Sequence, residues 1–195
     1  THFVHPPSDY STLWWNRSTE GRSEMMGEAL VRLARKLKPD FAIHCGDFAG
    51  WNTRENYEFG ASYMERLGCP WFPVPGNHDA WTPLSLEETG RLFPMNGMRS
   101  QRTDIGGLRL FLLDTASWFA KSGKVFPCIE RNRYDRGEMR TTGMPPEDIA
   151  WFAREAAACP LPAIVVTHAP ADYRPAYPIA TLPGGRPVSG PLTAP

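Results

Sequence analysis

The sequence lacks an excess of charge of either sign and lacks a long hydrophobic run. Its 195 residues contain 21 Lys and Arg against 21 Asp and Glu, so the formal net charge is zero. A nucleic-acid-binding protein needs basic side chains to neutralise phosphates, and we therefore expect no nucleic-acid partner. Because no apolar run reaches the ~18 residues of a membrane-spanning helix, we expect a soluble, cytoplasmic protein without a membrane partner.

Cysteine is also scarce. The four cysteines are widely spaced, and none forms a C-x-x-C pair: Cys45, Cys69, Cys128 and Cys159. This spacing argues against a zinc site built from thiolates. With 42% hydrophobic residues, the chain has enough apolar material for a core without disulfides. We interpret the cysteines as thiols in a reducing compartment, with an exported protein as the alternative.

Predicted helices and strands alternate in the first part of the chain. Apolar residues three or four positions apart predict amphipathic helices over residues 24–37 and 56–67. Each helix precedes a short apolar run of the buried-strand type, "DFAIHCGD" and "PWFPVPGN". This order predicts an α/β fold with neighbouring parallel strands covered by helices. The residues expected to face the core are Met26, Leu30, Leu33 and Leu37 in the first helix, and Tyr57, Ala61, Met64 and Leu67 in the second.

The second half predicts a hairpin, a helix and one more strand. Gly106-Gly107 lies between two strand-like runs and indicates a β-hairpin that ends at Asp114. Residues 119–144 are expected to form an irregular excursion over the surface. "PPEDIAWFAREAAA" has the signals of a helix start, and "PAIVVTHAP" is typical of a buried strand that ends at His168. The last 27 residues are rich in Pro and Gly, so we expect a loop there and a fold that continues beyond it.

Polar residues follow three of the predicted strands. They are Asp47 after the first, Asn77, His78 and Asp79 after the second, and His168 after the third. Carboxyl ends of strands in α/β sheets are where ligand clefts form, and oxygen and imidazole donors suit ions such as Mn²⁺, Fe²⁺, Zn²⁺ or Co²⁺. Gly-Asp is by itself a common turn, and a single His at a strand end is usually only a polar tip. In "GNHD", however, Gly76 can supply a tight turn, which leaves Asn-His-Asp without a structural explanation.

The "GD" of "FAIHCGDFAG", the "GNHD" of "VPGNHDAW" and the His of "VVTHAP" resemble motifs of the calcineurin-like metallophosphoesterases. The order of elements is similar over much of the chain. The resemblance implies one domain over residues 1–195, a β-sandwich of mixed sheets flanked by helices (α/β/β/α) and incomplete at its C-terminal end. It also implies a dinuclear, metal-dependent hydrolase, in which a metal-bound hydroxide attacks a small-molecule phosphodiester or phosphomonoester. The two divalent ions would be Mn, Fe, Zn or Co.

The resemblance further implies a role for each motif residue. Asp47 would bridge the two ions, and Asn77 and His168 would bind the second ion. His78 would not bind metal; together with Asn77 it would contact the substrate, and it would stabilise the phosphoryl group or protonate the leaving oxygen. Asp79 would hold the His78 imidazole in place.

Two motifs of that family are not intact. Its opening D-x-H would correspond to "SDYS", where Ser11 stands in place of His and Pro6-Pro7 interrupts the strand. Either Asp9 is a degenerate ligand, or the true segment has been lost between His5 and Ser8. The closing G-H-x-H is absent, because no histidine follows His168. Fewer ligands bind metal more weakly. One alternative is therefore a catalytically impaired phosphoesterase-like binding or scaffold domain, and another is a metal-free binder of a small ligand. Substrate, metal and oligomeric state stay open.

Overall fold

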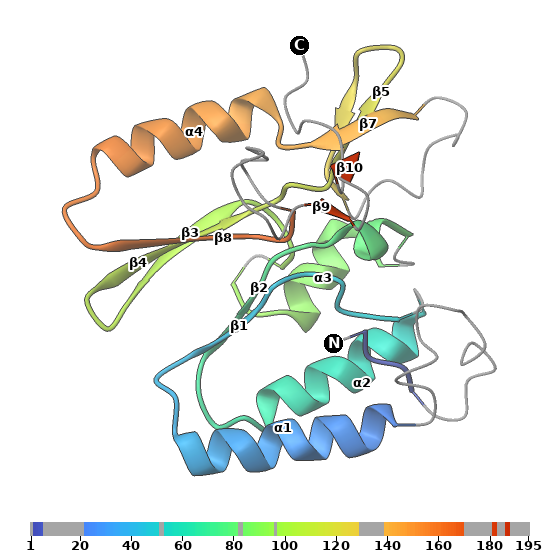
Figure 1. Cartoon of the computed structure of the whole chain (residues 1–195), viewed down its shortest axis with the longest axis vertical. Coiled ribbons are helices and arrows are strands. Elements are labelled where there is room, and N and C mark those ends of the chain that lie inside the picture. Colours follow the sequence, from blue (N-terminus) through green and yellow to red (C-terminus); the bar gives the residue numbers. More distant parts are fainter. Residues whose placement is uncertain are drawn as a thin grey trace.

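The computed structural model describes residues 2–5, 22–50, 53–81, 84–95, 97–128, 139–169, 181–182 and 186–187. The elements form four layers in the order helix, sheet, sheet, helix (Figure 1). Helices α1 (Ser23–Leu37) and α2 (Arg54–Glu65) form the first layer, and α4 (Pro146–Ala157) forms the last. This arrangement confirms the α/β class and the layer order expected from the sequence. Asp9 lies outside the described residues.

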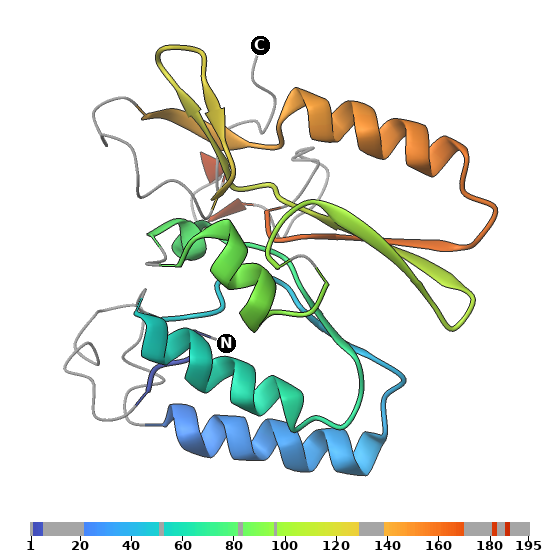
Figure 2. The ribbon, with the colours of Figure 1, turned by 180° about the vertical axis from the view of Figure 1, so that it is seen from behind.

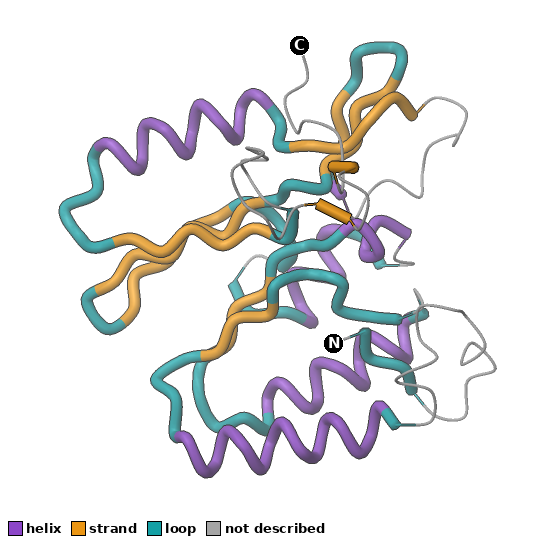
Figure 3. The backbone as a smooth tube through the Cα atoms, in the orientation of Figure 1, coloured by secondary structure: helices purple, strands orange, loops and turns teal. Residues whose placement is uncertain are grey.

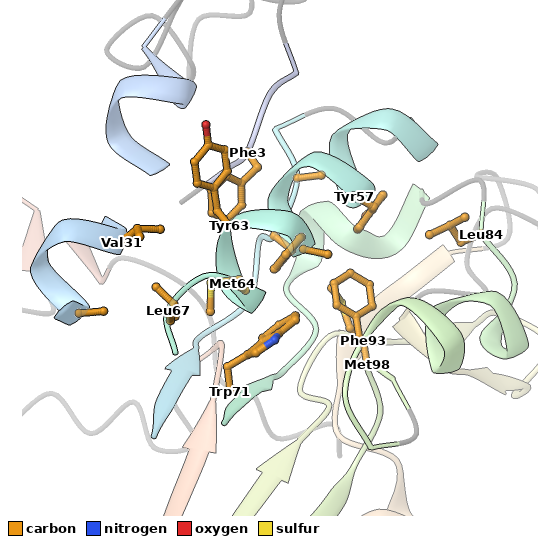
Figure 4. Close-up of a cluster of buried hydrophobic side chains, with 14 residues drawn as sticks. Phe3, Val31, Tyr57, Tyr63, Met64, Leu67, Trp71, Leu84, Phe93 and Met98 are labelled. Carbon is orange, nitrogen blue, oxygen red and sulfur yellow. The ribbon is translucent and has the colours of Figure 1, made fainter. Parts of the chain in front are cut away.

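The first sheet is a parallel pair that the chain builds by crossing through α2. Strand β1 (Ala42–His44) pairs in parallel with β2 (Trp71–Pro73), with Ile43 opposite Phe72. A connection between parallel strands needs a crossover, and α2 supplies it. The face of α2 predicted from its periodicity is confirmed, because its four expected core residues are all buried: Tyr57, Ala61, Met64 and Leu67. They join Trp71 and Phe93 in the largest hydrophobic cluster (Figure 4).

The face predicted for α1 is wrong except at Leu30, which is partly buried against the largest hydrophobic cluster. Met26, Leu33 and Leu37 are 39%, 49% and 65% exposed, whereas Gly27, Val31 and Ala34 are buried. The two helices approach closely at Gly27, where an added Cβ would lie 2.7 Å from the Tyr63 ring. Both stripes of α1 have helical spacing, so periodicity does not decide between them. The close approach selects the stripe with the smaller side chains.

The second sheet contains the predicted hairpin. Strands β3 (Gln101–Ile105) and β4 (Leu108–Leu113) are antiparallel around Gly106-Gly107, and both glycines have positive φ. Strand β8 (Ala163–Thr167) pairs in parallel with β4 on its other side. The expectation of a buried strand is wrong for most of β8, because Ile164 and Val165 are 39% and 47% exposed and only Val166 is buried. The resulting order is β3-β4-β8, and Figure 2 shows this sheet from behind.

Alternating residues of β4 serve the two faces of this sheet. Leu110 and Leu112 pack with Phe72, Val74 and Val166 in a cluster between the two sheets. Successive side chains of a strand point to opposite faces. Accordingly, Phe111 contacts the outer helix α4, with its ring centroid 5.0 Å from that of Phe152.

The expected irregular excursion over residues 119–144 is wrong where the structure describes it. Strands β5 (Ser117–Ala120), β6 (Val125–Phe126) and β7 (Met139–Gly143) form an antiparallel sheet in the order β6-β5-β7 (Figure 3). Residues 129–138 lie outside the described part of the chain. Trp118 in β5 is only 1% exposed, so this sheet has its own buried anchor.

Short elements complete the description. The 3₁₀ turn η3 covers Asn77–Trp81, and helix α3 (Leu86–Leu92) begins with a Ser85–Glu88 capping box. Near the end of the chain, where a loop was expected, β9 (Thr181–Leu182) and β10 (Arg186–Pro187) pair in antiparallel fashion. Within the described ranges, no helix combines the length and the apolar character needed to cross a bilayer.

Candidate metal centre

Three strand ends bring the predicted ligand residues together. Asp47, Asn77 and His168 follow β1, β2 and β8, which belong to two different sheets. The Nε2 atom of His168 lies 3.1 Å from Oδ1 of Asn77 and 3.4 Å from Oδ1 of Asp47. Residues separated by up to 121 positions in the sequence are therefore within contact distance of one another.

The His168 ring is fixed by its other nitrogen. Nδ1 lies 2.9 Å from the carbonyl oxygen of Cys45, which can only accept a hydrogen bond. Nδ1 therefore carries the hydrogen, and Nε2 of the neutral ring presents a lone pair. This acceptor nitrogen then has two oxygen acceptors close to it, Oδ1 of Asn77 and Oδ1 of Asp47. Acceptors this close are favourable only around a cation or a proton, and an imidazole, an amide oxygen and a carboxylate suit a divalent transition metal.

Two glycines allow this close approach. A Cβ on Gly76 would lie 2.2 Å from the backbone nitrogen of Asp47 and 2.3 Å from its Oδ1. A Cβ on Gly46 would lie 2.6 Å from Nδ1 of His168. Gly46 also has a φ of 85°, whereas Gly76 is not in the left-handed region. Gly76 is therefore required for space between two loops, and the turn expected from the sequence is not its reason.

Asp47 has an uncommon backbone conformation and a strongly acidic side chain. Its φ of 54° is left-handed, a conformation that costs a non-glycine residue about 1 kcal/mol and occurs often at functional sites. Burial alone would raise its pKa, but hydrogen bonds from His2 and from the His78 N–H lower the pKa to about 2. The carboxylate is therefore ionised at neutral pH, as a metal ligand must be.

His2 is a site residue that the sequence motif did not reveal. Its Nε2 lies 3.1 Å from Oδ2 of Asp47, and its ring centroid lies 5.2 Å from that of His78. The backbone places it there, because Phe3 pairs in parallel with Ala49 and the His2 N–H donates to the carbonyl oxygen of Asp47. By sequence, the family's D-x-H is matched to "SDYS", where Asp9 fills the first position of the motif, whereas His2 can match only the last position.

His78 and Asp79 point in different directions. In a 3₁₀ helix, with three residues per turn, neighbouring side chains diverge by about 120°. Asp79 is completely buried and accepts hydrogen bonds from the Phe48 N–H (3.0 Å), the Gly76 N–H (2.9 Å) and the Tyr57 hydroxyl (3.1 Å). These contacts correct the expectation that Asp79 orients the His78 imidazole. The carboxylate joins the backbones of the two loops that carry Asp47 and Asn77.

The surroundings of Asp47 lower the pKa of its carboxyl, whereas the surroundings of Asp79 raise the pKa of its carboxyl. Burial raises the pKa of Asp79 to about 6; hydrogen bonds from Gly76, Phe48 and Tyr57 oppose this rise, and the nearby Asp47 charge adds to it. His78 is only partly buried, and its backbone N–H donates to Oδ1 of Asp47 at 3.0 Å. The imidazole of His78 thus lies beside the centre, next to the His2 ring, and Asp79 does not hold it there.

The ligand set within the described residues is partial. Among them, no group of three or more His, Cys, Asp and Glu side chains is arranged as a metal site. Asn77 contributes an amide, which is not one of these four side-chain types. His2 and His168 approach different oxygens of Asp47. The geometry brings together one carboxylate, one amide and two imidazoles. Their role as metal ligands stays a prediction.

Comparison with known protein families finds one that accounts for nearly the whole chain. The family described as calcineurin-like phosphoesterase matches residues 2–189. The match begins at His2 and includes all the strand ends described above. No curated protein matches the chain.

Proposed function

The chain belongs to the calcineurin-like phosphoesterase family, and from this premise we propose that it is a metal-dependent hydrolase of phosphoric esters. The observation that supports this best is the convergence of Asp47, Asn77 and His168 from three separate strand ends. A scaffold domain would not need acceptor atoms facing one another around a common space, since their repulsion is relieved only by a proton or a cation.

The residues present fit a divalent ion. We propose that Asn77 and His168 hold one ion together with Asp47, and that His2 and Asp47 contribute to a second. Mn, Fe, Zn and Co are all compatible with this donor set. When bound, such ions supply Lewis acidity, which neutralises phosphoryl oxygens and makes water more acidic.

His78 and Asn77 are proposed to act on the substrate, a small-molecule phosphodiester or phosphomonoester. The backbone of His78 is anchored on Asp47 at 3.0 Å, which keeps its imidazole at the edge of the centre. From there the ring can donate a hydrogen bond to a phosphoryl oxygen or transfer a proton to the leaving oxygen. The Asn77 amide can present its NH₂ group to the substrate while its Oδ1 faces His168.

Hydrolysis of a chromogenic substrate tests the proposal. The protein would be freed of metal with a chelator, then assayed with Mn²⁺ on a p-nitrophenyl phosphodiester and on the corresponding monoester. We expect Mn²⁺-dependent hydrolysis that Asp47→Asn and His168→Ala abolish. His78→Ala should lower kcat about 10²-fold or more while Mn²⁺ still binds. Asp104→Asn, on the exposed β3 edge, is the control and should retain full activity. Hydrolysis that survives both Asp47→Asn and His78→Ala would refute the site assignment.

A catalytically impaired binding or scaffold domain is the second candidate. The partial ligand set among the described residues favours it. The same assay separates the two proposals, because Mn²⁺ binding without hydrolysis of either ester identifies the impaired domain.

A further inference from the structure

A cluster of three residues outside the proposed metal-binding motifs contacts two of the three loops that carry these motifs. The cluster comprises Asp114 and Thr115, which follow β4, and Cys128, which lies in the loop after β6. The Sγ atom of Cys128 lies 3.1 Å from the carbonyl oxygen of Gly76, the residue before Asn77. The Thr115 hydroxyl oxygen accepts a hydrogen bond of 3.1 Å from the N–H of Ala169, the residue after His168.

Asp114 holds this cluster together. Its carboxylate is 2% exposed and accepts hydrogen bonds from the N–H of Ala116 (2.9 Å), the hydroxyl of Ser117 (2.8 Å) and the N–H of Cys128 (3.0 Å). Its own N–H donates to the Ser100 hydroxyl oxygen at 2.9 Å. The bond to Cys128 joins two positions that are 14 residues apart, so Asp114 fixes where the Cys128 side chain starts.

The two contacts act on the peptide planes next to two predicted ligands. The carbonyl of Gly76 and the N–H of Asn77 belong to one planar peptide unit. A hydrogen bond to the Gly76 carbonyl therefore restricts rotation of the peptide unit that directly precedes the Cα atom of Asn77. In the same way, the N–H of Ala169 belongs to the peptide unit that follows His168. Because a carbonyl can only accept, the Cys128 thiol is the donor to Gly76.

We propose that Cys128 and Thr115 are positioning residues of the metal centre, which orient Asn77 and His168 through their neighbouring peptide units. This inference rests on the proposed function, since it assigns the positioned residues as ligands. Residues that orient metal ligands usually affect metal affinity when they are replaced. Cys128 and Thr115 contact the peptide units beside the proposed ligands, so their effect should appear in binding of the metal.

Conservative pairs of variants test the donor and the acceptor separately. Cys128→Ala removes the thiol donor, whereas Cys128→Ser keeps a donor at nearly the same place. Thr115→Val removes the hydroxyl acceptor at constant shape, and Thr115→Ser restores it. Dissociation constants for Mn²⁺ would be measured on the metal-free protein by the electron paramagnetic resonance signal of free Mn²⁺. Thermal unfolding without metal would be recorded for every variant.

We expect Cys128→Ala and Thr115→Val each to weaken Mn²⁺ binding about fivefold, as the loss of one hydrogen bond predicts. Both serine variants should bind within about twofold of the wild type. Cys159→Ala is the matched control: its Sγ lies 3.3 Å from the carbonyl of Leu161, before β8 begins, whereas His168 follows the other end of that strand. That variant should bind Mn²⁺ like the wild type.

A residue that only fills space would lower the melting temperature without changing the Mn²⁺ affinity. Unchanged affinity in Cys128→Ala or Thr115→Val would therefore overturn the assignment of that residue, as would a loss that serine does not restore. If Cys128→Ala does not fold, Thr115→Val decides the proposal through the His168 side. A wild-type protein that binds no Mn²⁺ would overturn the proposed function and this inference together. Normal binding in all variants would overturn the inference alone.

Discussion

Replacing Asp79 with asparagine is expected to change how the stability of the metal-free protein depends on pH. Burial raises the pKa of Asp79 from 3.8 to about 6, so the folded state binds this proton more tightly than the unfolded state. The contribution of the protonated carboxyl is fully present below pH ~4 and is lost as the pH rises through ~6. A shift of this size corresponds to a total of ~3 kcal/mol, at 1.36 kcal/mol per pKa unit.

Asparagine does not titrate, so the variant should lack this part of the pH dependence. The free energy of unfolding would be measured by urea titration with tryptophan fluorescence, in the presence of a chelator, at intervals from pH 4 to pH 7. We expect the stability of Asp79→Asn relative to the wild type to increase by up to ~3 kcal/mol across this range. Groups that titrate in both proteins cancel in the difference.

Asp104 provides a control of the opposite sign. The hydrogen bond from Arg109 lowers the pKa of this exposed carboxyl, so its contribution to stability is present at higher pH and is lost as the pH falls. Asp104→Asn should therefore show no gain relative to the wild type as the pH rises. A difference between Asp79→Asn and the wild type that stays constant from pH 4 to pH 7 would refute the buried, proton-binding role of Asp79.

Three further predictions concern the close approach of the loops, the Asp79 contacts and the core. Gly76→Ala should abolish Mn²⁺ binding, because its Cβ would lie 2.2 Å from the Asp47 nitrogen; wild-type affinity in a Mn²⁺ titration would contradict this. Tyr57→Phe removes the hydroxyl that lies 3.1 Å from Asp79, and urea titration should show that the free energy of unfolding falls by ~1–3 kcal/mol. An unchanged free energy of unfolding would mean that water replaces the hydroxyl. Leu112→Ala empties a fully buried position between the sheets and should cost ~2–5 kcal/mol; a cost well below that range would indicate that the two sheets close over the cavity.

Local patterns account for the parts of the fold that the sequence predicted. The buried face of α2, the Gly106-Gly107 hairpin and the strand ending before His168 depend on periodicity and turn chemistry within a few residues. The antiparallel sheet β6-β5-β7 was missed, because its strands are short and surrounded by charged residues. Likewise, the face of α1 that packs inward depends on how closely α2 approaches, which no local pattern encodes.

The same division holds for the candidate site. The sequence indicated Asp47, Asn77 and His168 because polar residues of these types follow apolar runs of the strand type, and the structure places His168 Nε2 3.1 Å and 3.4 Å from oxygens of Asn77 and Asp47. It did not indicate His2, which reaches Asp47 only through the pairing of Phe3 with Ala49. Which side chains meet at a site depends on pairings between distant segments.

The sequence by itself determined the order of α1, β1, α2, β2, the β3–β4 hairpin, α4 and β8, the class of fold and the types of side chain at the strand ends, because these follow from the near neighbours of each residue. Only the tertiary structure decided the direction of Asp79 toward the backbone, the need for a glycine at position 76, and the contacts of Thr115 and Cys128 with the loops that carry Asn77 and His168. These features arise where chain segments far apart in the sequence come within a hydrogen-bond length of one another. That distance is set by the packing of the two sheets and their helices as a whole.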